Sequence, residues 1–262
     1  MSGRMTLIHQ NLYLLVQLIR RDLMLRYRGS IFGVLWMLLH PLIMLTILAV
    51  VSATIFQTRW PYQDNSVPFW LTLYAGLIVF NLFSETLLRS PAAVRSQPNY
   101  VKKMIFPVEL LPIVSLGSAI VQAGFNLIVM VVALAWTGNL SVQILWLPVL
   151  LLPLILFTLG VAWFVSAWGV FIKDISQIMP VVLQMLLFLS PILYPVSAVP
   201  SFLQPLYQYN PLAIIIEISR AASTGQPIMW ASWLTVLLPS LLICWLGYQF
   251  FMRAREEFAD VL

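Results

Sequence analysis

The sequence predicts an all-α polytopic membrane protein with six transmembrane helices. Five stretches contain no Asp, Glu, Lys or Arg: 29–58, 65–84, 110–172, 175–216 and 221–252. A helix needs about 20 apolar residues to cross the hydrocarbon core of roughly 30 Å, and a charge at mid-span is costly. Only 9% of the residues are charged and 61% are hydrophobic, whereas soluble proteins average about 25% charged. Closed barrels need alternating strands, which this pattern lacks, so the crossings are expected to be helices.

The uncharged stretches divide into six crossings, at about 31–56, 68–88, 110–136, 145–172, 178–194 and 233–252. The stretch 110–172 is too long for one helix, and the turn signal Gly138-Asn139 splits it. The 262 residues leave room for one membrane domain, 31–262, and not for a separate soluble catalytic domain. The single cysteine, Cys244, lies in an apolar stretch and excludes an intrachain disulfide.

Six crossings place both termini on one side of the membrane. That side carries 12 of the 14 Lys and Arg residues, and by the positive-inside rule it is cytoplasmic. Arg59 and Arg220 fall on the other side. Because the basic residues flank apolar stretches, the net charge of +5 reflects topology, and no nucleic-acid partner is expected. The residues on the cytoplasmic side are Arg4, Arg20, Arg21, Arg26, Arg28, Arg89, Arg95, Lys102, Lys103, Lys173, Arg253 and Arg255.

Residues 1–30 predict an amphipathic cytoplasmic helix that lies in the inner headgroup plane, where arginines meet anionic membrane lipid. The basic segment extends to Arg28, and the apolar stretch after it is too long for a cleavable signal peptide. Two roles remain open for this helix, a simple basic anchor or a docking surface for a cytoplasmic partner. Its apolar face carries Leu12, Leu15, Val16, Ile19 and Leu23, and its polar face carries Gln10, Gln17, Arg20 and Arg21.

Motifs for nucleotide hydrolysis and for hydrolytic catalysis are missing, so no catalytic residue is assigned. His9 and His40 with one cysteine do not make a clustered metal site. Glu85 lies near the cytoplasmic end of its span, with Arg89 expected as its i,i+4 partner. With no carboxylate at mid-membrane depth, an ion-coupled carrier or membrane-embedded enzyme is disfavoured. Any energy-consuming function then needs a partner chain.

Three segments depart from plain membrane helices. Arg26–Leu42 leads into the first span, with Gly29 at a bend and Pro41 predicted to kink the helix. The cytoplasmic loop 90–108 mixes basic and apolar residues, and its section 98–106 fits a short helix along the membrane. The external segment 195–228 follows Ser190-Pro191 and is rich in proline, which indicates short re-entrant helices, one from near Pro211 to before Gly225.

These segments, above all Arg26–Leu42, Asn99–Pro112 and Ser190–Leu212, resemble the permease subunits of type-2 ATP-binding-cassette exporters. The nearest branch exports O-antigen, capsule and teichoic-acid polymers. The resemblance covers nearly the whole chain and implies a homodimer in the bacterial inner membrane, with two separate ATPase subunits beneath it. Those subunits would bind ATP and Mg, and this chain would bind no cofactor. In that family the loop between the second and third spans is the coupling helix, and the N-terminal helix is a second contact. The residues then expected to face the ATPase are Arg95, Asn99, Tyr100, Lys102 and Lys103, together with Arg20 and Arg21.

Aromatic side chains are the candidates for the substrate path, because their faces stack on the C–H faces of sugar rings. The alternative is that most of them are interfacial anchors or packing residues. His40 is expected to be a packed kink residue. The path candidates are Trp36, Phe69, Trp70, Tyr74, Phe80, Tyr194, Tyr207 and Tyr209.

The function expected from these features is export of a lipid-linked polysaccharide. Teichoic acid, a drug or a small lipid is the alternative cargo on the same scaffold.

Overall fold

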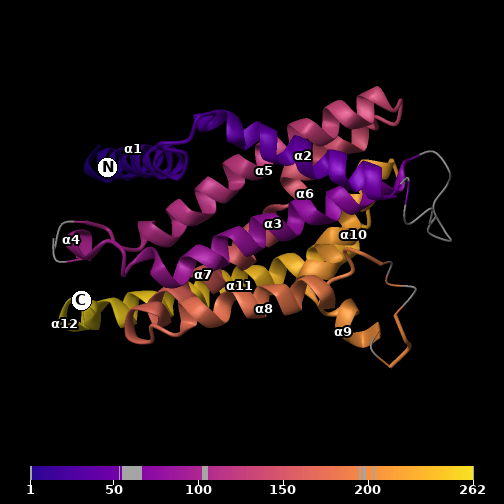
Figure 1. The fold of residues 1–262 in the computed structure, drawn as a ribbon. Coiled ribbons are helices and arrows are strands. Elements are labelled where there is room, and N and C mark those ends of the chain that lie inside the picture. The colour runs from indigo at the N-terminus through magenta and orange to yellow at the C-terminus, as the bar shows by residue number, and fades with distance from the viewer. Residues whose placement is uncertain are drawn as a thin grey trace.

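The computed structural model describes residues 2–52, 54, 67–101, 106–194, 196, 199–202 and 204–261. Within these ranges all regular structure is helical, which confirms the predicted all-α fold. Long helices lie side by side in one bundle, and both chain termini lie at the same end of it (Figure 1). The bundle contains α2 (Trp36–Val51, after η1, Gly33–Leu35), α3 (Phe69–Ala93), α5 (Leu110–Trp136), α7 (Leu152–Phe171), α8 (Ile175–Leu189) and α11 (Trp230–Ala254).

The described helices include five that are long and apolar enough to cross a membrane, so the chain is a multi-pass membrane protein. The fourth of them joins η3 (Val142–Trp146) and α6 (Leu147–Leu150) to α7. Helix α8 is a sixth apolar helix of 15 residues, which spans roughly 22 Å at 1.5 Å per residue. It is shorter than a full crossing, and the extended chain from Ser190 takes over at its outer end.

Helix α3 is the centre of the bundle. It packs against α2, α5, α7, α8 and α10, and every residue from Leu71 to Phe80 is buried. By contrast, α2 and α11 bury few of their apolar side chains within the chain, so their outer faces meet lipid or another chain in the membrane. Helix α3 also continues through Pro91 to Ala93, beyond the end expected at Leu88. Its last turns therefore belong to the segment that the sequence assigned to the loop.

Glycines set the closest helix crossings. A Cβ at Gly160 or Gly247 would clash with the backbone of the facing helix, so α7 and α11 touch through their main chains. A Cβ at Gly169 would lie 2.1 Å from the carbonyl oxygen of Pro91, which brings α7 equally close to α3. On α5, Gly117 faces Ile19 of α1. Gly117 therefore packs within the chain itself, whereas a Cβ at Gly124 would meet nothing within 4 Å.

At the end opposite the termini, two short helices form a cap: α9 (Gln204–Gln208) and α10 (Pro211–Thr224). The Asn210 side chain accepts a hydrogen bond from the Leu212 backbone N–H at 3.0 Å, which begins α10, and Gly225 ends it at φ 76°. Helix α10 packs against α3, α6 and α11. The chain turns back around α10 without a full crossing, and this is tolerated because the helix is covered by other parts of the protein.

The end that holds the termini is here called the basic end. It comprises α1 (Ser2–Arg26), α4 (Pro98–Val101), η5 (Arg255–Glu257) and α12 (Phe258–Val261), together with the adjoining helix ends. Helix α1 packs against α5. A short helix was expected at 98–106. The structure has α4 at the start of this range, and 102–105 lie outside the described residues.

Candidate functional site

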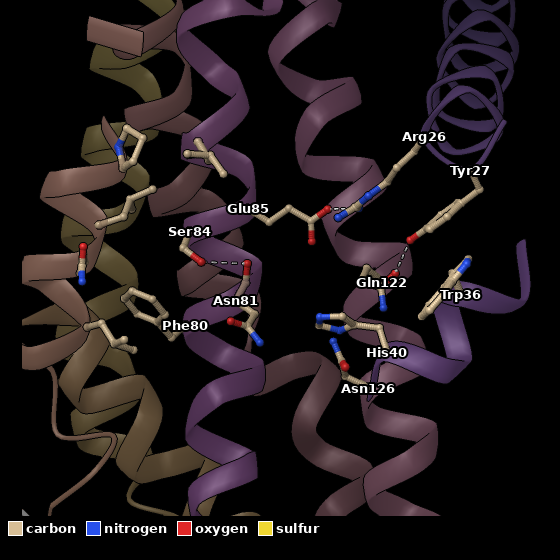
Figure 2. A pocket seen from close by; sticks show the side chains of 15 residues that line it. Arg26, Tyr27, Trp36, His40, Phe80, Asn81, Ser84, Glu85, Gln122 and Asn126 are labelled. Atoms are coloured by element: carbon tan, nitrogen blue, oxygen red, sulfur yellow. Dashed lines mark hydrogen bonds and ion pairs between the residues drawn. The ribbon is translucent and has the colours of Figure 1, made fainter. Parts of the chain in front are cut away.

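A cavity of about 580 Å³ runs along α3, between α8 on one side and α2 and α5 on the other (Figure 2). Its volume falls within the roughly 300–1,000 Å³ typical of ligand sites. The exposed residues His40, Pro180 and Gln184 line it, so one side is open in the single chain. We call this cavity the groove. Its lining residues are Arg26, Tyr27, Trp36, His40, Phe80, Asn81, Ser84, Glu85, Leu88, Gln122, Asn126, Pro180, Leu183, Gln184 and Leu187.

The groove is unusually polar for the interior of an apolar bundle. Asn81, Ser84 and Glu85 lie on one face of α3, because residues three and four apart share a helix face. Gln122 and Asn126 do the same on α5, and Asn126 accepts a hydrogen bond from the buried Tyr74 hydroxyl at 3.1 Å. Polar side chains within membrane spans are costly and mark ligand pathways. The groove therefore presents amide and hydroxyl groups inside an apolar bundle.

His40 belongs to this polar lining. It projects from α2 into the groove and is exposed (Figure 2). The expectation of a packed kink residue was therefore wrong. Pro41, the next residue, is buried and takes the packed position instead.

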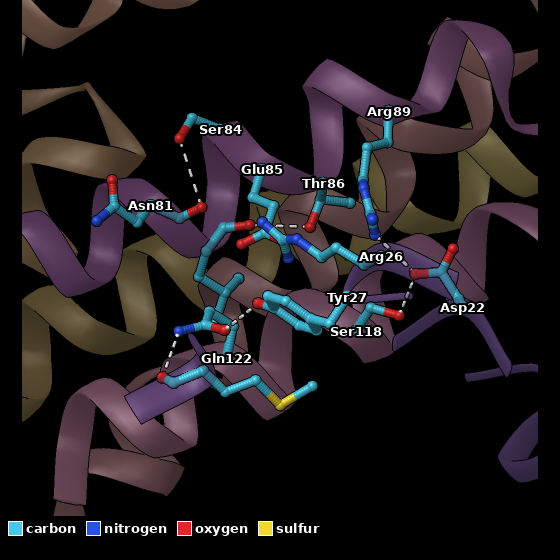
Figure 3. A network of polar contacts seen from close by, with 12 residues as sticks. Asp22, Arg26, Tyr27, Asn81, Ser84, Glu85, Thr86, Arg89, Ser118 and Gln122 are labelled. Carbon is cyan, nitrogen blue, oxygen red and sulfur yellow. Dashed lines mark hydrogen bonds and ion pairs between the residues drawn. The ribbon is translucent and has the colours of Figure 1, made fainter. Parts of the chain in front are cut away.

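The end of α1 lines the groove and joins a network of polar contacts with α3 and α5 (Figure 3). The Arg26 guanidinium forms an ion pair with Glu85 of α3. The Tyr27 hydroxyl donates to Gln122 Oε1 at 3.3 Å, and Gln122 Nε2 donates to the Met37 carbonyl oxygen at 3.0 Å. Burial raises the pKa of the Tyr27 phenol, so the group stays protonated and able to donate. These contacts join α1, α2, α3 and α5 at one point.

The expected partnership of Glu85 with Arg89 is wrong, because α1 supplies nearer partners to both. Glu85 pairs with Arg26, while Arg89 Nη1 lies 2.8 Å from Asp22 Oδ2. The same Asp22 oxygen accepts a hydrogen bond from Ser118 Oγ of α5 at 2.7 Å. The spacing rule considers one helix alone, whereas here the partners come from a neighbouring helix.

Three of the residues predicted to face an ATPase have described side-chain contacts. Arg21 and Tyr100 come together: Arg21 Nη1 donates to the Tyr100 hydroxyl at 2.6 Å, and Tyr100 stacks on Phe106 with centroids 4.3 Å apart. Arg95 instead turns inward, and its Nη2 donates to Ser176 Oγ of α8 at 3.3 Å.

The remaining predicted ATPase contacts are less fully described. Arg20 is exposed on α1. The backbone of Asn99 belongs to α4, but its side chain is outside the described set. Lys102 and Lys103 lie outside the described residues.

The aromatic path candidates also separate. Trp36 and Phe80 line the groove, and Tyr74 reaches it through Asn126. Phe69 and Trp70 are half-buried in the first turn of α3, away from the groove. In the cap, the hydroxyls of Tyr194 and Tyr207 lie 2.7 Å apart, while Tyr209 is 84% exposed. The structure thus places two of the eight in the groove and three in or beside the cap.

Sequence reasoning missed most of the polar lining, and a signal for it was present. Polar residues at helical spacing inside an uncharged stretch, such as Asn81 with Ser84 or Gln122 with Asn126, indicate a polar face that lipid cannot satisfy. Within the described ranges no three His, Cys, Asp or Glu side chains come together as metal ligands.

Arg220, which the sequence places on the side of the membrane opposite the other basic residues, lies buried in the cap, with 3% of its surface exposed. Its guanidinium donates to the carbonyl oxygens of Thr72, Pro191 and Ile192, at 3.2, 2.6 and 2.6 Å. It also forms an ion pair with Glu217 at 2.8 Å. One side chain therefore joins α10 to α3 and to the chain that leaves α8.

Comparison with known proteins places this architecture in a family. The family model described as "ABC-2 type transporter" matches residues 13–223. The O-antigen export system permease protein RfbA of Myxococcus xanthus is 25% identical, covering 97% of this chain and 96% of its own length. A protein of the same name from Klebsiella pneumoniae is 22% identical, covering 95% of each chain. The polysialic acid transport protein KpsM of Escherichia coli is 26% identical, covering 77% of this chain and 78% of its own length. The chain therefore belongs to the ABC-2 type transporter family.

Proposed function

We propose that this chain is the membrane permease of an ATP-driven exporter that carries a lipid-linked polysaccharide, of O-antigen or capsule type, across the bacterial inner membrane. The observation that carries the proposal is the groove, which combines amide and hydroxyl side chains with Trp36 and Phe80 inside an apolar bundle. The similarity to O-antigen export permeases over nearly the whole chain supports the choice of cargo. The permease performs no bond chemistry itself.

The groove suits a moving sugar polymer. Hydroxyl-rich rings can exchange hydrogen bonds with Asn81, Gln122 and Gln184, and aromatic faces accept successive rings without fixing one position. Because the groove is open along one side, a second copy of the chain would complete it. Apolar side chains exposed on α2 and α8 beside the groove are available for that contact.

The basic end is the cytoplasmic face in this proposal, and the ATPase docks there. ATP and Mg are held by that partner, in two copies for a dimer of this chain. Arg20, Arg21, Asn99, Tyr100, Lys102 and Lys103 are the residues offered to it, and Arg95 supports the loop from within. Since Arg21 and Arg26 lie on consecutive turns of α1, motion at Tyr100 is passed to the groove by one helix.

Removal of groove amides tests the path. The double variant Asn81→Leu with Gln184→Leu should lower export, because each lost hydrogen bond of about 1 kcal/mol weakens passage roughly fivefold. Surface polysaccharide is measured by immunoblot in a deletion strain that expresses the variant. Gln177→Leu, an exposed amide of α8 outside the groove, is the matched control. Normal export in the double variant would contradict the assignment of the groove.

The deletion strain itself tests the cargo. Loss of surface polysaccharide with unchanged antibiotic sensitivity is the expected result. Retained polysaccharide with new drug sensitivity would show that the cargo is a drug or small lipid. Loss of teichoic acid would assign that polymer instead.

A further inference from the structure

After α11 ends, residues 255–261 continue the helical course through η5 into α12, which packs against α7. Phe258 of α12 is fully buried, and its ring lies 5.4 Å from the ring of Phe251, which is also fully buried. Phe258 also lies 5.9 Å from the ring of Phe171 at the end of α7.

The same apolar cluster holds both ends of the loop that carries α4. Val94, just after α3, is 0% exposed, and Val108, just before α5, is 3% exposed. Both belong to one cluster with Phe251 and Phe258, and the loop residues Tyr100 and Phe106 pack against its edge. Phe258 of the C-terminal segment thus forms part of the apolar cluster on which the loop packs.

A polar contact fixes the same junction. Arg255 Nη1 lies 3.0 Å from Glu109 Oε2, and Glu109 is the residue that precedes α5. The Glu109 carbonyl oxygen accepts a hydrogen bond from Trp163 Nε1 at 3.2 Å. Residues from α7 and from the segment after α11 therefore converge where the loop enters α5.

We propose that the C-terminal segment 255–261 is a positioning element for energy coupling. It holds the α4 loop against the bundle, so that a push from the ATPase moves α3 and α5 instead of bending the loop. The inference rests on the proposed function and adds a part of the chain that lies outside both the loop and α1. Phe258 and Arg255 act through Val108 and Glu109, and neither needs to touch the ATPase or the cargo.

The test uses the full complex of permease and ATPase in vesicles, with lipid-linked polysaccharide as cargo. Phe258→Ala and Arg255→Gln should leave complex assembly and ATP hydrolysis intact. The amount of cargo moved per ATP should fall by about two- to thirtyfold, the range expected when a coupling contact is removed. Glu256→Gln, an exposed neighbour, is the control and should not change this ratio.

A charge exchange separates positioning from general stability. Glu109→Arg alone should lower the ratio, and Glu109→Arg combined with Arg255→Glu should restore part of it. Unchanged ratios in both Phe258→Ala and Arg255→Gln would overturn the inference. If Phe258→Ala does not reach the membrane, Arg255→Gln and the charge exchange decide by the same criterion. If the native complex moves no polysaccharide with ATP, the proposed function has failed, a result distinct from loss of coupling in the variants.

Discussion

The two ends of the bundle are both held together by arginines, but by different kinds of contact. At the basic end, Arg26, Arg89 and Arg255 pair with carboxylates on other segments, and their side chains are 28–33% exposed. In the cap, Arg220 is 3% exposed and donates mainly to backbone carbonyl oxygens. Partly exposed ion pairs contribute about 0–1 kcal/mol each, whereas removal of one partner from a buried charged contact costs about 3–5 kcal/mol.

This difference indicates which end is built to rearrange. Contacts at the basic end can break and re-form at small cost, as a segment driven by a partner requires. The cap is joined to α3 and to the end of α8 through one buried side chain, so α10 follows those elements as a unit. In the proposed exporter, movement that the ATPase starts at the basic end would reach the cap through α3, which packs against α10.

The largest effect is expected at the cap. Arg220→Met should lower the free energy of unfolding by about 3–5 kcal/mol, because three carbonyl groups and Glu217 lose a buried donor. Thermal unfolding of the purified protein in detergent measures the loss. Arg253→Met removes an exposed arginine of α11 and is the matched control. Equal stability of the two variants would show that the buried contacts of Arg220 do not stabilise the cap more than an exposed arginine does, which would contradict the contrast between the two ends.

A smaller effect on stability, but a clear one on transport, is expected where α1 meets α5. In Gly117→Leu the new Cβ would lie 2.3 Å from Ile19 Cδ1, so the Ile19 side chain must shift and the larger leucine is expected to displace α1. ATP-driven export should fall while the bundle stays folded, and adding Ile19→Ala should restore part of the export. Gly124→Leu, on the same helix with no neighbour within 4 Å, is the control. Full export by Gly117→Leu would show that close packing of α1 against α5 is not needed for export.

The smallest effect on stability is expected for Asp22→Asn. It removes the ion pair with Arg89, whose side chains are 28% and 35% exposed, and the stability loss should stay below about 1 kcal/mol. The loss should shrink further at high salt, because partly exposed pairs are screened. Unfolding in low and high salt measures this, with Asp174→Asn, an exposed carboxylate, as the control. A loss as large as that of Arg220→Met would contradict the division between the two ends.

The sequence predicted well those features that depend on local signals. Helix α5 occupies the expected range 110–136, because a charge precedes it and the Gly138 turn follows it. Helix α10 begins at Pro211 and ends before Gly225, where proline and a left-handed glycine mark the limits of a helix. Such signals are readable because each depends on one residue and its neighbours in the chain.

Features that depend on contacts between helices could not be read in this way. The partner of Glu85 was assigned to its own helix, whereas the true partner, Arg26, comes from α1. Sequence reasoning could assign Arg220 only to a side of the membrane, and the folded cap shows that it donates to three carbonyl groups. Phe258, near the chain end, gave no local sign that it completes the cluster under the α4 loop.

Transport by reconstituted vesicles tests the central claim most directly, that this chain conducts and a separate ATPase drives it. Vesicles that contain the permease together with the ATPase should move lipid-linked polysaccharide when ATP is supplied. Vesicles with the permease alone should move none, with or without an ion gradient. Directed transport by the permease alone would contradict the account.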